Sequence, residues 1–249
     1  FFLSAFIGAM LGLQNLQHAT ALTLTFHGVV AQPLFPWETT QAHLRGLVGQ
    51  LKSSGFVALS PSRFPQWRES KITGTRFFLL TFDDGLKSSA EMMRILKREE
   101  GIDSAIFVVT DFIGKEGYLS ENDLRELASD GFLIGLHGKR HLDVTMIPGT
   151  RETLAQELAD ARKHLETITN KPVEWYAFPF GEFNAAAKSS VAMAGLKMAF
   201  TVEPQENIRD SDPYQLPRIM YLKGAKEAGE PVIEDWIPPP NVKTGWLHL

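Results

Sequence analysis

The chain has 249 residues, of which 44% are hydrophobic and 22% are charged, and it contains no Cys. This composition indicates a globular protein with one large domain or two small ones, and it excludes disulfides, a thiolate nucleophile and any metal site with Cys ligands. The 25 Lys and Arg and 29 Asp and Glu give a formal net charge of −4, so we expect no nucleic-acid partner.

The N-terminal segment is almost entirely apolar. Residues 1–13 are too short for a membrane span, which needs about 20 residues. They are followed by Ala19-Thr20-Ala21, a small-x-small pattern of the kind that signal peptidase reads. We therefore predict that residues 1–21 are the remnant of an export signal and that the mature, extracytoplasmic protein (secreted, cell-surface or periplasmic) begins near Leu22. A buried or interfacial segment of the mature protein is the alternative.

From Leu22 onward, short β-like runs alternate with stretches of helical period. This alternation predicts an α/β fold in which helices cover parallel strands. No linker divides the chain, so we expect one domain over residues 22–249, with an irregular tail from about Gly224. The predicted strands are residues 22–26, 76–82, 104–109, 132–136, 173–178, 198–202 and 216–221. The predicted helices are residues 40–54, 88–99, 120–129, 151–169 and 184–194.

Two adjacent carboxylates, Asp83 and Asp84, follow the predicted strand 76–82 and precede Gly85. The carboxyl ends of parallel strands are where α/β active sites are built. Because neighbouring side chains at a strand end point in different directions, one carboxylate can bind a metal while the other faces the water that the metal activates. A simple Asp-Asp-Gly turn is the alternative.

Two histidines, His137 and His141, follow the predicted strand 132–136. At this spacing their imidazoles can converge on one metal ion. Two unrelated surface histidines would give the same short pattern, but the aspartate pair about fifty residues earlier favours a shared metal site.

A third motif, YAFPFGEFN, occupies residues 176–184. An aromatic-Pro-aromatic-Gly run at a strand end can shape the wall of a sugar-sized groove and present backbone N–H groups to an oxyanion. An apolar strand closed by a Pro/Gly turn is the alternative.

In this order and spacing, the three motifs resemble the polysaccharide deacetylases of carbohydrate esterase family 4, over about residues 22–221. The resemblance implies a distorted (β/α) barrel with fewer than eight regular repeats. It also implies that Asp83 is the catalytic base and that Asp84, His137 and His141 are the metal ligands.

The same resemblance implies an oxyanion site at the third motif. The backbone N–H of Phe180, between Pro179 and Gly181, would face the oxyanion. Shorter matches are similar to the branch that acts on poly-β-1,6-N-acetylglucosamine, and they cover residues 25–29, 178–184 and 216–219.

The sequence departs from the family pattern at two places. Ala177 stands where the family commonly has an Arg that pairs with the catalytic base, so we expect Arg218, or with less support Lys115, to hold Asp83 instead. The family often supplies a late Leu-x-His as general acid; the late candidate here is His248, and His27 could take this role or bind the departing acetate.

The resemblance implies a metal-dependent N-deacetylase of a biofilm exopolysaccharide, with acetate as product. We expect zinc as the metal, with iron, cobalt or nickel as alternatives, an acetylated glycan polymer as partner, and a monomer. Peripheral membrane contact through Phe112, Ile113 or the N-terminal segment is a further expectation. The alternative substrates are peptidoglycan, chitooligosaccharide and O-acetylated glycans, and the alternative from another class is a non-catalytic glycan-binding module.

Overall fold

The computed structural model describes residues 19–72, 74, 76–147, 149–226, 228 and 232–238. Most of the predicted export signal and His248 lie outside these residues. The strands are β1 (Thr20–Phe26), β2 (Val57–Ala58), β3 (Arg76–Phe82), β4 (Ser104–Val108), β5 (Leu133–Leu136), β6 (Trp175–Ala177), β7 (Met198–Phe200), β8 (Asn207–Ile208) and β9 (Ile219–Met220). The α-helices are α2 (Gln41–Ser53), α3 (Phe64–Arg68), α4 (Lys87–Glu100), α5 (Glu121–Ser129), α6 (Arg151–Thr169) and α7 (Ala185–Met193). Short 3₁₀ helices are η1 (Pro61–Arg63), η2 (Thr110–Phe112), η3 (Pro179–Gly181) and η4 (Ile233–Trp236).

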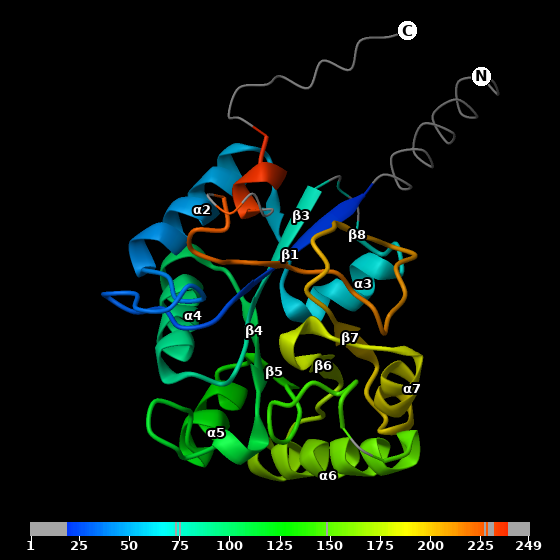
Figure 1. The fold of residues 1–249 in the computed structure, drawn as a ribbon. Coiled ribbons are helices and arrows are strands. Elements are labelled where there is room, and N and C mark those ends of the chain that lie inside the picture. Colours follow the sequence, from blue (N-terminus) through cyan, green and yellow to red (C-terminus); the bar gives the residue numbers. More distant parts are fainter. Residues whose placement is uncertain are drawn as a thin grey trace, which may run out of the picture.

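The strands form one curled sheet in the order β7-β6-β5-β4-β3-β1-β8, with β2 also paired to β3 and β9 to β1. The pairings from β1 through β3, β4, β5 and β6 to β7 are parallel, whereas β8 runs antiparallel to β1. Helices α2, α4, α5, α6 and α7 follow one another around the outside of the sheet (Figure 1). The predicted α/β distorted barrel is confirmed.

Residues 216–220, here called the closing segment, connect the edge strand β7 to β1 on the other side of the sheet. Leu216 forms a parallel bridge with Phe200 of β7, and Ile219 pairs with Leu24 of β1. The segment therefore spans the gap between β7 and β1, and Arg218 in its middle enters the barrel interior, where it is fully buried.

Alternate residues of the strands pack on opposite faces of the sheet, as the twofold period of a strand requires. In β3, Phe78 and Leu80 belong to the cluster under the outer helices, whereas Phe77 and Leu79 belong to the interior cluster. Helix α3 adds Phe64 to that interior cluster, where its ring lies 5.7 Å from that of Trp175. Because Phe77 and Trp175 stand at the starts of their strands, α3 closes this end of the barrel and leaves the opposite end for the site.

The sequence predicted the long elements best. Strand β3 and helix α6 have their predicted bounds, and Ser120 caps α5 through a capping box with Asp123. The predicted strands 173–178, 198–202 and 216–221 are shorter in the structure, and β2, α3 and β8 were not predicted. The tail predicted as irregular contains η4, which buries Ile233.

The start of β1 overlaps the end of the predicted export signal. Thr20 and Ala21 pair with Arg76 and Phe77 in the sheet, so a chain that began at Leu22 would lack two paired residues of β1. Among the described helices, none has both the length and the apolar character needed to cross a membrane.

A substitution at Gly135 in β5 would test the packing of the barrel interior. A Cβ at this position would lie 2.5 Å from the Phe107 ring and 3.1 Å from the Trp175 carbonyl oxygen. Gly135→Ala should therefore lower the free energy of unfolding by about 1–3 kcal/mol in urea denaturation. Gly46→Ala, in α2 with nothing within 4 Å of the new Cβ, is the control and should raise it by about 0.5–1 kcal/mol. Equal effects of the two substitutions would contradict this account of the interior.

Candidate active site

Asp83 and Asp84 leave the end of β3 in different directions. The Asp83 N–H donates to the Phe26 carbonyl at 2.9 Å, which continues the pairing of β3 with β1, and its side chain is buried. Asp84 then adopts φ 72° and Gly85 φ 76°. This left-handed turn ends the strand and separates the two carboxylates, as different roles for them require.

Arg218 holds the Asp83 carboxylate from the closing segment. Its guanidinium donates to both carboxylate oxygens of Asp83, each at 2.8 Å. It also donates to the hydroxyls of Thr25 and Thr81, at 3.1 and 3.3 Å, and to the Thr201 carbonyl at 2.9 Å. The structure thus brings Arg218 to Asp83, whereas the ammonium of Lys115, the other candidate, lies 4.7 Å from the centre of the Phe112 ring.

The Arg218 fork determines the charge state of Asp83. Burial by itself would raise the pKa of Asp83, but the Arg218 guanidinium, with His137 and His27 adding to its effect, holds it well below its usual range. Asp83 is therefore ionised at neutral pH and oriented by two charge-assisted hydrogen bonds.

His137 directly follows β5 and is held by its backbone and its ring. Its N–H donates to the Val108 carbonyl at 2.8 Å, and its Nδ1 lies 2.8 Å from the Ala177 carbonyl oxygen. A carbonyl can only accept, so Nδ1 carries the proton and the Nε2 lone pair is free to bind a metal. Ala177, which stands where the family commonly has an Arg, thus supplies a backbone acceptor.

His141 reaches the same point through a turn at Gly138 (φ 78°) and itself adopts φ 54°. Its ring makes an edge contact with the Phe180 ring, with 4.6 Å between the centroids. Burial lowers the pKa of His137 to about 4 and also lowers that of His141. Both imidazoles are therefore neutral at pH 7, the form that binds metals.

Three donor atoms converge where these segments meet. Oδ1 of Asp84 lies 3.3 Å from Nε2 of His141 and 3.6 Å from Nε2 of His137. Donors about 2.0–2.2 Å from one ion at tetrahedral angles lie about 3.4 Å apart, so these spacings fit a metal. The donor set of two imidazoles and one carboxylate is the kind that binds catalytic zinc and related ions while leaving positions open.

The surroundings of Asp84 also fit a cation. Its Oδ1 is buried without a hydrogen-bond partner. Burial raises the pKa of Asp84 to about 6, and the charge of Asp83 adds to the rise. A divalent ion would satisfy the unpaired oxygen and favour the ionised carboxylate.

The donors open into a cleft of about 390 Å³. Its lining combines the acidic and imidazole groups with apolar walls, as ligand sites usually do. The lining residues are His27, Trp37, Asp83, Asp84, Tyr118, His137, His141, Phe178, Phe180, Gly181, Val202, Met220 and Leu222.

The third motif forms the cleft wall as a strained turn. Phe180 adopts φ 61°, ψ 0°, and Gly181 follows with φ 76°. A Cβ at Gly181 would collide with Val202, and its nearest backbone contact would be the Val202 nitrogen at 2.8 Å. Pro179 is buried behind the turn, whereas 59% of the Phe180 surface is exposed. Such strain is typical of functional sites.

The structure also places the remaining predicted residues. His27 lines the cleft with a buried Nδ1 that has no hydrogen-bond partner. Phe112 and Ile113, proposed for lipid contact, are both half-buried, and Ile113 packs against the core. Trp37 and Tyr118 also line the cleft and were not predicted from the sequence. The aromatic-rich Phe35-Pro36-Trp37, soon after the His27 motif, is the signal that could have indicated Trp37.

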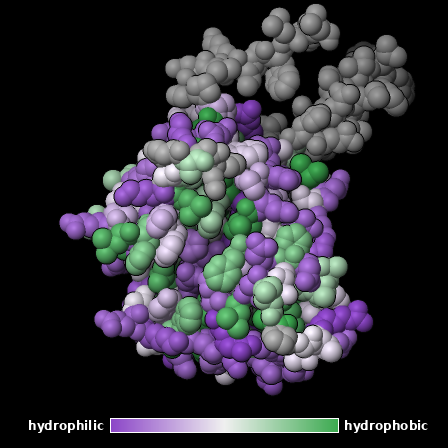
Figure 2. Space-filling model, viewed as in Figure 1, coloured by the Kyte–Doolittle hydropathy of each residue, from purple (hydrophilic) through white to green (hydrophobic). Residues whose placement is uncertain are grey.

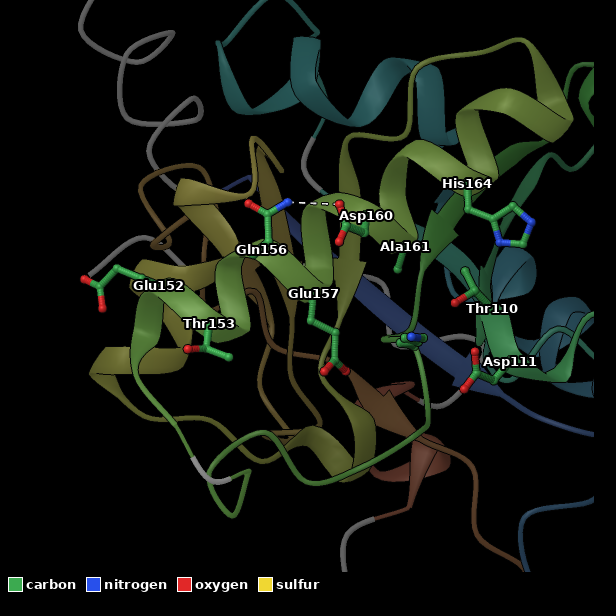
Figure 3. A pocket seen from close by; sticks show the side chains of 10 residues that line it. Thr110, Asp111, Glu152, Thr153, Gln156, Glu157, Asp160, Ala161 and His164 are labelled. Atoms are coloured by element: carbon green, nitrogen blue, oxygen red, sulfur yellow. Dashed lines mark hydrogen bonds between the residues drawn. The ribbon is translucent and has the colours of Figure 1, made fainter.

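A larger cavity, of about 770 Å³, lies along α6 and is more acidic (Figure 3). Two of its carboxylates are engaged by neighbouring side chains: Glu157 binds Arg140 at 2.9 Å, and Asp160 accepts from Gln156 at 2.9 Å. Within the described part of the chain, the three-donor cluster at Asp84 is the one that could hold a metal. The larger volume of the cavity along α6 therefore does not make it the candidate active site.

Residues 70–199, just over half of the chain, match the family described as polysaccharide deacetylase. The Bacillus subtilis protein named "Putative polysaccharide deacetylase YxkH" is 25% identical over 190 residues, which are 76% of this chain and 66% of that protein. A Staphylococcus aureus poly-beta-1,6-N-acetyl-D-glucosamine N-deacetylase is 22% identical over 212 residues, which are 80% of this chain and 72% of that protein.

Solved structures share the fold. IcaB from Ammonifex degensii superposes with a TM-score of 0.73 at 20% identity, covering 82% of this chain and 92% of that one. The Streptococcus pyogenes deacetylase PplD, in complex with acetate, gives 0.75 at 16% identity, covering 89% of this chain and 99% of that one. Arg218 lies beyond the family match, so its place against Asp83 comes from the structure of this chain.

Replacing Arg218 should cost much of the stability. Arg218→Met leaves a buried, unpaired Asp83 carboxylate, which should lower the free energy of unfolding by about 3–5 kcal/mol. Adding Asp83→Asn removes the stranded charge and should restore part of the loss. Arg94→Met, at an exposed ion pair with Glu126, is the control and should change stability little. Denaturant unfolding of the four proteins measures this, and an Arg218→Met variant as stable as the wild type would contradict the assigned pairing.

Metal binding can be measured without activity. Metal-free protein should bind one Zn²⁺ in calorimetry, and zinc at about 100 times its dissociation constant should stabilise the fold by about 2.7 kcal/mol. His141→Ala should lose most of this stabilisation in thermal unfolding, whereas His164→Ala, an exposed histidine outside the cluster, should keep it. Equal zinc responses of the two variants would place the metal elsewhere.

Proposed function

The chain belongs to the polysaccharide deacetylase family, and we propose that it is a metal-dependent hydrolase that removes N-acetyl groups from an extracellular polysaccharide. We propose poly-β-1,6-N-acetylglucosamine of a biofilm matrix as the substrate and acetate as the released product. The observation that carries this proposal is the convergence of Asp84, His137 and His141 beside an Arg-paired Asp83 in one cleft.

Asp84, His137 and His141 would hold the metal ion. A divalent ion there, zinc in our proposal with iron, cobalt or nickel as alternatives, would polarise the acetyl carbonyl and acidify a water, so that a weak base is sufficient. Asp83 is that base: Arg218 keeps its carboxylate ionised and fixed, ready to accept the proton of the attacking water.

The other cleft residues would act on the charge that develops in the reaction. The backbone N–H of Phe180 is proposed to donate to the oxyanion, with the strained turn from Pro179 to Gly181 setting its direction. His27 is proposed to protonate the leaving amine or to bind the departing acetate. Its unpartnered buried Nδ1 supports a role that involves a ligand.

Two observations support the proposed glycan. The Staphylococcus aureus relative is named for poly-beta-1,6-N-acetyl-D-glucosamine, and residues 25–29, 178–184 and 216–219 resemble the branch that acts on this polymer. All three stretches contribute to the cleft or to the Arg218–Asp83 pair. The apolar N-terminal segment supports our proposal that the protein acts outside the cytoplasm.

Acetate release tests the function. Wild-type protein with Zn²⁺ or Co²⁺ should release acetate from acetylated glucosamine oligomers. Asp83→Asn should lower the rate by at least about 10²-fold while zinc affinity stays within a few-fold, because the carboxamide cannot accept the proton and the metal donors are unchanged. His137→Ala should lose both zinc and activity.

Two outcomes would decide against parts of this proposal. Full activity in both variants would show that the site is wrong, and absence of release from every acetylated glycan would favour a glycan-binding module. Faster release from β-1,4-linked than from β-1,6-linked oligomers would overturn the proposed polymer and leave the deacetylase proposal intact.

A further inference from the structure

The loop between β1 and α2, residues 28–39, carries two stacked aromatic rings at the edge of the cleft. The rings of Phe35 and Trp37 are parallel, with centroids 5.0 Å apart and 1° between their planes. Trp37 also lines the cleft that contains Asp84 and the two histidines. One aromatic stack is therefore built into the wall of the candidate active site, outside the three sequence motifs.

Hydrogen bonds hold this loop in place. The Glu38 carboxylate accepts from the N–H groups of Leu34 and Phe35, at 2.7 and 3.0 Å. The Pro36 carbonyl accepts from the N–H of Lys223 at 2.7 Å, which ties the loop to the chain that follows the closing segment. The two ends of the loop also bond to each other, from Thr39 N–H to the Gly28 carbonyl at 2.9 Å. A ligand would therefore meet an aromatic surface that is already ordered.

The two rings expose apolar surface to solvent, and the packing of the fold does not explain this exposure. Phe35 is 50% and Trp37 43% exposed, and neither belongs to the hydrophobic core. The loop projects from the domain between β1 and α2 (Figure 1), and hydrophobic side chains reach the surface on this face of the molecule (Figure 2). Exposed aromatic surface beside a cleft is typical of ligand recognition.

The shape and charge of the stack select the kind of ligand. An aromatic face carries partial negative charge, and the C–H groups on one face of a pyranose ring carry partial positive charge, so the two surfaces are complementary. Trp37 lines the cleft, whereas Phe35, stacked on it, does not, so the aromatic surface extends outward from the cleft. A neighbouring ring of the chain can therefore lie on Trp37 while the acetyl group of another ring reaches the buried donors. The site would thus engage at least two units of a chain.

We propose that Trp37, supported by Phe35, forms a second sugar-binding subsite, which holds a neighbouring ring of the acetylated glycan by stacking. This inference rests on the proposed function for the identity of the glycan. Trp37 contributes binding to the polymer and takes no part in the chemistry, so its effect depends on the length of the substrate.

Substrates of two sizes test the subsite. Trp37→Ala should lower kcat/KM for a β-1,6-linked N-acetylglucosamine pentamer about five- to tenfold, through KM. The loss should be smaller for single N-acetylglucosamine, because one ring cannot occupy both positions. Trp37→Phe should keep most of the pentamer activity. Leu34→Ala is the matched control, because Leu34 is 85% exposed on the same loop but does not line the cleft.

A measurement of glycan binding distinguishes failure of this inference from failure of the proposed function. If the wild type releases no acetate, the function fails, and calorimetry with the same pentamer still decides the subsite: weaker binding by Trp37→Ala supports it. Equal pentamer activity and binding in Trp37→Ala and wild type would overturn it, as would failure of the wild type to bind the pentamer. Loss of binding to phosphatidylglycerol vesicles, with pentamer binding unchanged, would also overturn it and assign the loop to a lipid surface.

Discussion

The buried ion pair between Arg218 and Asp83 is the interaction on which the rest of the site depends. It joins the closing segment to the end of β3 across the barrel interior, with both carboxylate oxygens engaged at 2.8 Å. Removing either charge would strand the other in a low-dielectric interior, so the pair is stable only when the closing segment bridges β7 and β1. The same fork keeps Asp83 ionised and oriented, which leaves Asp84 to complete the donor cluster with His137 and His141. Closure of the barrel and the proposed division of roles between two adjacent aspartates thus have one physical cause.

Backbone strain gathers around this pair. Asp84, His141 and Phe180 are all non-glycine residues with positive φ, and each lines the cleft. Such conformations cost about 1 kcal/mol or more apiece and persist only where the surroundings enforce them. Here the enforcing contacts are the parallel strands that precede each residue, together with glycines at 85, 138 and 181 in the turns. The strained turns hold the donor atoms close together before any ligand binds.

Much of this arrangement could be predicted from the sequence, and there are physical reasons why the remaining elements and residues could not. Periodicity locates β3 and α6 because both are long and strongly patterned. The sequence favoured Arg218 over Lys115 as the partner of Asp83, but only the path of the closing segment, which places Arg218 inside the barrel, supplies the contact. Helix α3 escaped prediction because it has five residues with Pro65 among them, and β2 and β8 because two-residue strands carry no period. Trp37 was not predicted because it lies in a loop, where the sequence has no periodicity that places a side chain. Its position depends on stacking with Phe35, whose N–H is bound by Glu38.

We propose that Arg218 reserves Asp83 for proton transfer and leaves Asp84 as the metal ligand. A crystal structure of the zinc-loaded protein tests this most directly. We expect an Asp84 oxygen and the Nε2 atoms of His137 and His141 to lie about 2.0–2.2 Å from the ion, with both carboxylate oxygens of Asp83 still bound by Arg218. A structure in which Asp83 coordinates zinc and Arg218 has released it would contradict the account.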